Sequence, residues 1–145
     1  LRLQGGVIGN GTSVTRSVSA LEQDVTVNFA RPIEVALSIE LTLDTTATYE
    51  GDDYVANRLV EYVGGTRTDG SNIIGLGANE NVYVSQLRDA VLTDSGVRAI
   101  ADMTIDTNGD GTDDRTTDTN GVELLSVAAE EQAFLDATNV TITQV

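Results

Sequence analysis

The chain has 145 residues, of which 40% are apolar, so it is long enough for one domain with a buried core. It contains no cysteine and no histidine, which excludes disulfides, thiolate metal sites, cysteine nucleophiles and histidine-based catalysis. No apolar run approaches the roughly 18 residues that a membrane-spanning helix needs.

The formal net charge is −15, and all eight basic residues are arginine. Direct nucleic-acid binding is not expected, because contacts to phosphates need clustered Lys or Arg. The acidic residues are spread along the whole chain, which favours a protein from a high-salt environment, where carboxylates keep the surface hydrated and salt screens their repulsion. A cation-binding surface and a merely acidic protein are the two alternatives.

Residues 1–23 are rich in Gly, Ser and Thr, and we interpret them as an irregular segment with one short strand near residues 13–18. Residues 25–43 then place apolar side chains on every second position, which is the period of a strand with one buried face. The Arg31-Pro32 step interrupts this run, because proline removes a backbone donor. The segment therefore predicts two strands, or one strand broken by a kink.

Two helices are expected in the middle of the chain. Residues 52–63 have acidic residues at the start and one apolar stripe, which is typical of an amphipathic helix. A loop of turn-forming residues follows at 64–79. Ser85 is then the predicted N-cap of a short helix that reaches about Thr93.

The last third of the chain predicts strands around an acidic turn. Residues 97–105 alternate as a strand, and residues 122–127 are the expected return strand beside it. Residues 128–134 are ambiguous, and residues 140–145 form the last strand. The expected fold is α+β: a small mixed or antiparallel sheet with two helices packed on one face, plus an acidic β-hairpin insertion. In this interpretation residues 1–23 link to a further N-terminal region, and residues 24–145 form the α+β domain.

The sharpest chemical motif runs from Asp106 to Asp114 and resembles the front half of an EF-hand calcium loop. Oxygen-bearing side chains fall on alternate positions and a glycine sits at the sixth. The candidate structural Ca²⁺ ligands are Asp106, Asn108, Asp110, Thr112 (through its carbonyl) and Asp114. The bidentate Glu expected at the twelfth position is missing, since Thr117 stands there. The alternative is an acidic, solvated hairpin tip.

Catalytic equipment is not apparent, so the chain is not expected to be an enzyme. Without histidine, a general base near neutral pH would have to be a perturbed carboxylate or a tyrosine. The carboxylate pairs, such as Asp52 with Asp53, are adjacent in sequence, and neighbours on a strand point to opposite faces.

Several segments, taken in order, resemble the C-terminal part of the baseplate J-like family, whose members build the baseplate wedges of contractile phage tails and related injection machines. The resemblance covers residues 9–142, but no single motif is specific. The matching segments are Gly11-Thr12-Ser13, Val27-Asn28-Phe29-Ala30-Arg31-Pro32, Val82-Tyr83-Val84-Ser85-Gln86-Leu87, Gly96-Val97, Glu131-x-Ala133 and Asn139-Val140-x-Ile142. The long loop at 67–79 and the acidic insertion at 106–119 depart from the family pattern.

The resemblance implies a structural role in the virion, at the tail baseplate, after assembly in the cytoplasm of a host that the acidity suggests is halophilic. The implied partners are other wedge subunits, hub or tube-proximal proteins, tail-fibre proteins and further copies of this chain in a symmetric ring. Arg31, Pro32 and Tyr83 are the candidate interface residues. The alternatives are a simple strand break for Arg31 and Pro32, and a core position for Tyr83.

A second class of function explains the acidic motif without the family resemblance. A calcium-dependent binding or adhesion module of a secreted or surface protein would account for residues 106–114 and for the acidity. It leaves the Arg31-Pro32 step and residues 82–87 unexplained.

Overall fold

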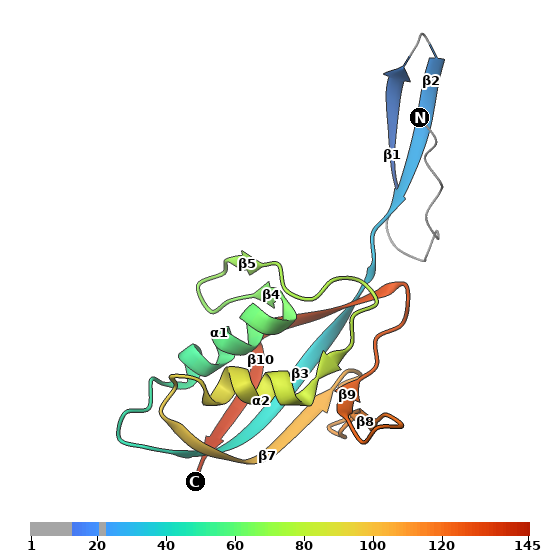
Figure 1. Ribbon diagram of the computed structural model, residues 1–145. Helices are drawn as coiled ribbons and strands as arrows, with labels where there is room; N and C mark the ends of the chain where they lie inside the picture. Colours follow the sequence, from blue (N-terminus) through green and yellow to red (C-terminus); the bar gives the residue numbers. More distant parts are fainter. Residues whose placement is uncertain (1–12, 21–22) are drawn as a thin grey trace.

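The computed structural model describes residues 13–20 and 23–145 (Figure 1). Two helices and ten strands follow one another in these residues. In order they are β1 (Ser13–Ala20), β2 (Gln23–Ala30), β3 (Ile33–Thr45), α1 (Asp52–Val63), β4 (Gly65–Thr66), β5 (Asn72–Ile73), β6 (Val82–Tyr83), α2 (Val84–Leu92), β7 (Val97–Asp106), β8 (Thr116–Thr117), β9 (Glu123–Leu125) and β10 (Glu131–Gln144).

The main sheet has five strands in the order β5-β4-β10-β3-β7. The central strand β3 runs parallel to β10 on one side and antiparallel to β7 on the other. Both helices lie over the same face of this sheet (Figure 1). The predicted fold class, α+β with a mixed sheet and two helices on one face, is therefore confirmed.

The core forms between this face of the sheet and the two helices. Alternate residues of β3 (Leu37, Ile39, Leu41 and Leu43) are buried. Helix α1 has the predicted bounds and buries its apolar stripe against them. Helix α2 begins at Val84, one residue before the expected cap, because Val84, Leu87 and Val91 together form its buried face. The predicted Ser85 cap is therefore wrong, and Tyr83 occupies the N-cap position.

The first strands form a separate hairpin. β1 pairs antiparallel with β2 from Ser13–Ala30 to Ala20–Gln23, and among the described strands neither pairs with any other. In Figure 1 this hairpin extends away from the helices and the main sheet. The Arg31-Pro32 step lies between β2 and β3, so the two-strand alternative is confirmed, with the strands in different sheets. The predicted domain spans residues 24–145, and the strands of the main sheet begin at Ile33.

The acidic insertion leads into a small second sheet with the order β6-β9-β8. The predicted pairing of residues 122–127 beside residues 97–105 is wrong, because β9 pairs with β6 and β8 instead of β7. The end of β7 instead hydrogen-bonds to the acidic motif, since the Asp114 N–H donates to the Ile105 carbonyl at 2.8 Å. The β8–β9 hairpin turns at residues 118–122, so the acidic motif precedes the hairpin and does not form its tip.

The final strand, β10, is continuous through the ambiguous residues and ends at Gln144. A bulge separates Leu135 from Val140 in its pairing with β3. Asp136 stabilises the bulge, since its Oδ1 accepts the N–H of Thr138 at 2.9 Å and its hydroxyl at 2.7 Å. Neither helix in the described part of the chain is long and apolar enough to cross a membrane.

Candidate functional site

The acidic motif forms a tight loop around Asp106, the last residue of β7. Only 8% of Asp106 is exposed. One carboxylate oxygen accepts the N–H groups of Asn108 at 2.9 Å and Gly109 at 2.7 Å, and the other accepts that of Gly111 at 2.7 Å. Asp106 therefore closes the loop by satisfying three backbone donors that face inward.

The other candidate ligands hydrogen-bond within the same loop. The Asn108 side chain accepts the Asp110 N–H at 2.9 Å, and the Asp110 carboxylate accepts the Thr112 N–H at 2.8 Å and its hydroxyl at 2.5 Å. Asp114 turns toward Thr107, whose N–H and hydroxyl donate to it at 2.8 and 2.6 Å.

These donors favour the ionised carboxylates. The N–H groups of Gly111 and Asn108 lower the pKa of Asp106 below its ordinary value of 3.8. The hydroxyl and the N–H of Thr112 lower the pKa of Asp110 in the same way. Both side chains are therefore anionic at neutral pH and act as fixed acceptors in the loop.

The loop does not present a formed metal cage. In the part of the chain that the structure describes, no three acidic side chains lie together in a way that would hold a metal ion. The hydrogen bonds instead explain the order of oxygen side chains and glycines as a self-closed turn. In these bonds Asp110 accepts through Oδ1 alone and Asp114 through Oδ2 alone, and calcium binding stays a prediction.

The candidate interface residues are accessible. Arg31 and Pro32 are exposed at the junction between the β1–β2 hairpin and the main sheet. Tyr83 is 42% exposed, so its predicted alternative as a core residue is wrong, while a role at an interface stays a prediction. The structure does not join these residues to the acidic loop through any hydrogen bond among the described residues.

Tyr83 lies at a hollow of about 520 Å³, which residues 76–86 and helix α1 surround. The Tyr83 N–H donates to the hydroxyl of Tyr62 at 3.1 Å, and burial raises the pKa of Tyr62 above its ordinary value. The other residues that line the hollow are Leu76, Asn79, Glu80, Asn81 and Gln86. Around this hollow the exposed ring of Tyr83 therefore lies beside amide groups and the carboxylate of Glu80.

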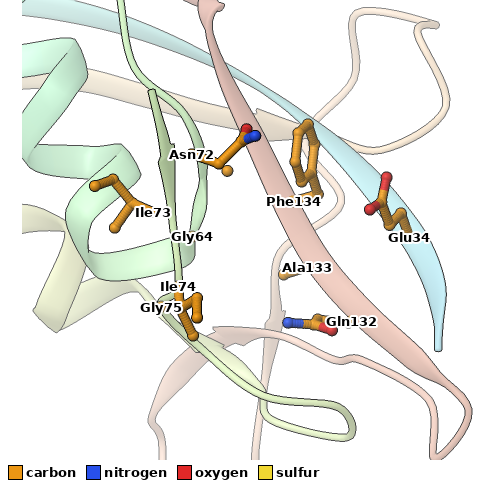
Figure 2. Close-up of a pocket in the computed structure, with 10 residues that line it drawn as sticks. Glu34, Gly64, Asn72, Ile73, Ile74, Gly75, Gln132, Ala133 and Phe134 are labelled. Carbon is orange, nitrogen blue, oxygen red and sulfur yellow. The ribbon is translucent and has the colours of Figure 1, made fainter. Parts of the chain in front are cut away.

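A second cavity of about 280 Å³ lies where β4 and β5 meet the first half of β10. In Figure 2, Phe134 and Glu34 lie on one side of β10, and Ile73 lies toward the helix. Ile74 stands at the rim and is 96% exposed. The sequence interpretation predicted no cavity here, because the apolar residues of the loop do not indicate which strand the loop will pack beside.

No protein-family model matches the chain, and a search of curated proteins finds no match at the threshold applied.

Proposed function

We propose that the chain is a structural subunit of a contractile-tail baseplate wedge, in the virion of a virus or in a related injection machine. It would be held in a symmetric ring by contacts with its own copies, wedge neighbours, hub or tube-proximal proteins and fibre proteins. The resemblance of the ordered segments is the origin of this proposal, and the architecture described above supports it.

The observation that carries the proposal is the β1–β2 hairpin. Among the described strands it pairs only with itself, and it extends away from the main sheet (Figure 1). A lone two-stranded hairpin is at best marginally stable in water. A protein that retains such an arm is therefore expected to hold it against another subunit.

The uncovered face of the main sheet supports the same reading. Both helices cover one face, and on the opposite face of β3 the side chains of Glu34, Ala36 and Glu40 are exposed. A polar face of this kind suits the solvent-accessible rim of an interface that is only partly apolar. The function would then be mechanical: subunits hold the ring in one arrangement and shift against each other when the tail is triggered.

The proposal is tested in the particle itself. We expect genes beside this one to encode sheath and tube proteins, and electron cryomicroscopy of the tail to show this domain in the ring at its base. Deletion of the gene should give tails without assembled baseplates. A secretory leader with tandem copies of the domain, on a cell surface and not in a tail, would contradict the proposal and favour the calcium-dependent adhesion module.

A further inference from the structure

The second half of β10 has an open hydrogen-bonding edge. Within β10, only Leu135 and Asp136 pair with β4. Beyond the bulge, Val140–Gln144 pair with β3 alone among the described strands. The Val145 N–H donates to the Leu43 carbonyl at 3.0 Å, and this bond determines which backbone groups of the strand face β3. The backbone groups of Thr141 and Thr143 therefore face β3, and those of Val140, Ile142 and Gln144 point away from the sheet.

The bulge between Leu135 and Val140 interrupts the first part of this edge, but the part beyond the bulge has no protecting residue of its own. Residues 140–144, here termed the edge strip, read Val-Thr-Ile-Thr-Gln, without a charge, a proline or a glycine. Natural sheet edges are normally blunted by charges, prolines or bulges, because unpaired N–H and C=O groups attract another strand. An uncharged strip rich in β-branched residues is typical of an edge that pairs with another strand.

The opposite edge of the same sheet is protected. β7 carries two bulges in its pairing with β3, and Arg98 and Asp102 place charges along it. At the end of β7, the Ile105 N–H donates to the Asp113 carboxylate and the Ile105 carbonyl accepts the Asp114 N–H. A head-to-tail array in which β10 of one copy pairs with β7 of the next is therefore disfavoured.

We propose that the edge strip pairs with the edge strip of a second copy, antiparallel, about a two-fold axis at Thr141. In this register the outward backbone groups of Val140 meet those of Ile142 in the other copy, and the two Thr141 residues face each other as the close, non-hydrogen-bonded pair. Each copy carries a net charge of −15, so a seam without charged residues is where two copies can approach. The resulting dimer has one continuous sheet across both subunits.

The test is sedimentation velocity over a concentration series in high salt. We expect the wild-type chain to form a dimer. Thr141→Glu should weaken association by about tenfold, because two carboxylates then face each other across the seam. The side chain of Thr141 is exposed and its backbone groups face β3, so the hydrogen bonds of the subunit stay in place. The new carboxylate also lies beside Glu40 of β3, so a thermal melt of each variant separates any loss of subunit stability from loss of the dimer.

A charge exchange gives the decisive control. The Thr141→Lys variant alone should also have a weakened dimer. A mixture of the Thr141→Glu and Thr141→Lys variants should form a heterodimer. The wild-type chain has no lysine, so the Glu variant can be labelled at its α-amino group and followed in the mixture. Ala101→Glu, at an exposed position on β7, introduces the same charge at the other edge and should leave the dimer intact.

A wild-type chain that stays monomeric throughout the series would overturn the inference. A dimer that tolerates Thr141→Glu, or that Ala101→Glu disrupts equally, would also overturn it. If the Glu variant fails to fold, the Lys variant alone and the wild-type series decide the same question. None of these outcomes bears on whether the domain belongs to a baseplate.

Discussion

Gly96, just before β7, lies against the backbone of residues 48–49. An ideal Cβ on Gly96 would lie 2.4 Å from the Thr48 carbonyl oxygen, whereas one on Gly121 meets nothing within 4 Å. Both glycines have similar positive φ angles, 73° and 81°. Gly121→Ala should lose about 1–2 kcal/mol for the left-handed backbone, and Gly96→Ala about 1–3 kcal/mol more for the clash. Denaturant unfolding of both variants measures this difference, and equal losses would contradict the packing that the structure shows.

Asp106 makes the acidic loop sensitive to acid. Its pKa is lowered in the folded state, so its stabilising contribution is present above the ordinary value of 3.8 and is lost as the pH falls through the lowered pKa. Asp106→Asn should reduce stability at pH 7, because the amide nitrogen cannot accept the Gly111 N–H. The difference from wild type should shrink as the pH falls below 3.8. Thermal melts at several pH values measure it.

Asp102→Asn is the matched control, since the Asp102 carboxylate accepts no hydrogen bond among the described residues. It should leave stability at pH 7 nearly unchanged. If Asp102→Asn and Asp106→Asn have the same effect, the hydrogen bonds within the loop are not what stabilises it.

At the scale of elements, the same loop tests the calcium prediction. Calcium should raise the melting temperature of the wild-type chain, and Asp110→Ala should abolish that gain. Melts are compared with calcium, with chelator and with magnesium. Identical melting temperatures of the wild-type chain in all three conditions would contradict a metal site, and the loop would then be a self-closed turn.

The β1–β2 hairpin gives the second element-scale prediction. Because β1 and β2 pair only with each other among the described strands, a chain that begins at Arg31 should keep the melting temperature of the main domain. Removal of residues 140–145 should instead lower it strongly, since this part of β10 is paired along β3. A large loss of stability on removing the hairpin would show that the arm packs on its own subunit.

Local periodicity predicted those elements whose burial follows one regular pattern. Helix α1 has the expected bounds because acidic residues begin it, an apolar stripe runs through it and Gly64 ends it. β3 was predicted because its apolar side chains alternate along one buried face. β10 was not recognised as one strand because its bulge shifts the phase: Ala133 and Leu135 point into the core on odd positions, and Val140 and Ile142 pack there on even positions.

Pairing partners and site contacts depend on groups distant in sequence. Nothing in residues 122–127 indicates that β9 will join β6, because β6 is distant in sequence. The acidic motif was visible in the sequence, but its hydrogen bonds and the hollow at Tyr83 were not. Periodicity therefore predicted the layers, and the surfaces between elements required the structure.

At the scale of the whole molecule, charge is the dominant feature. The chain has eight arginines and 23 acidic residues, so one-to-one pairing leaves fifteen carboxylates without an arginine. Two of the ion pairs in the described residues, Arg88–Glu123 and Arg98–Asp44, are exposed pairs, which contribute little. The remaining pairs are half-buried and involve few of the carboxylates: Arg58–Glu61, Arg67–Glu61 and Arg115–Asp113. Repulsion among the remaining carboxylates should therefore oppose folding in dilute buffer.

This repulsion predicts that stability rises with salt. The screening length falls from about 10 Å at 0.1 M to about 3 Å at 1 M, so added sodium chloride should raise the melting temperature at pH 7. Near pH 4.1, the isoelectric point of the sequence, many carboxylates are protonated and the same salt should have little effect. Sodium and potassium chloride should act alike if screening is the cause, whereas a gain specific to one cation would indicate bound ions. A melting temperature indifferent to salt at pH 7 would contradict the high-salt interpretation, because the acidic surface would then carry no energetic penalty for salt to relieve.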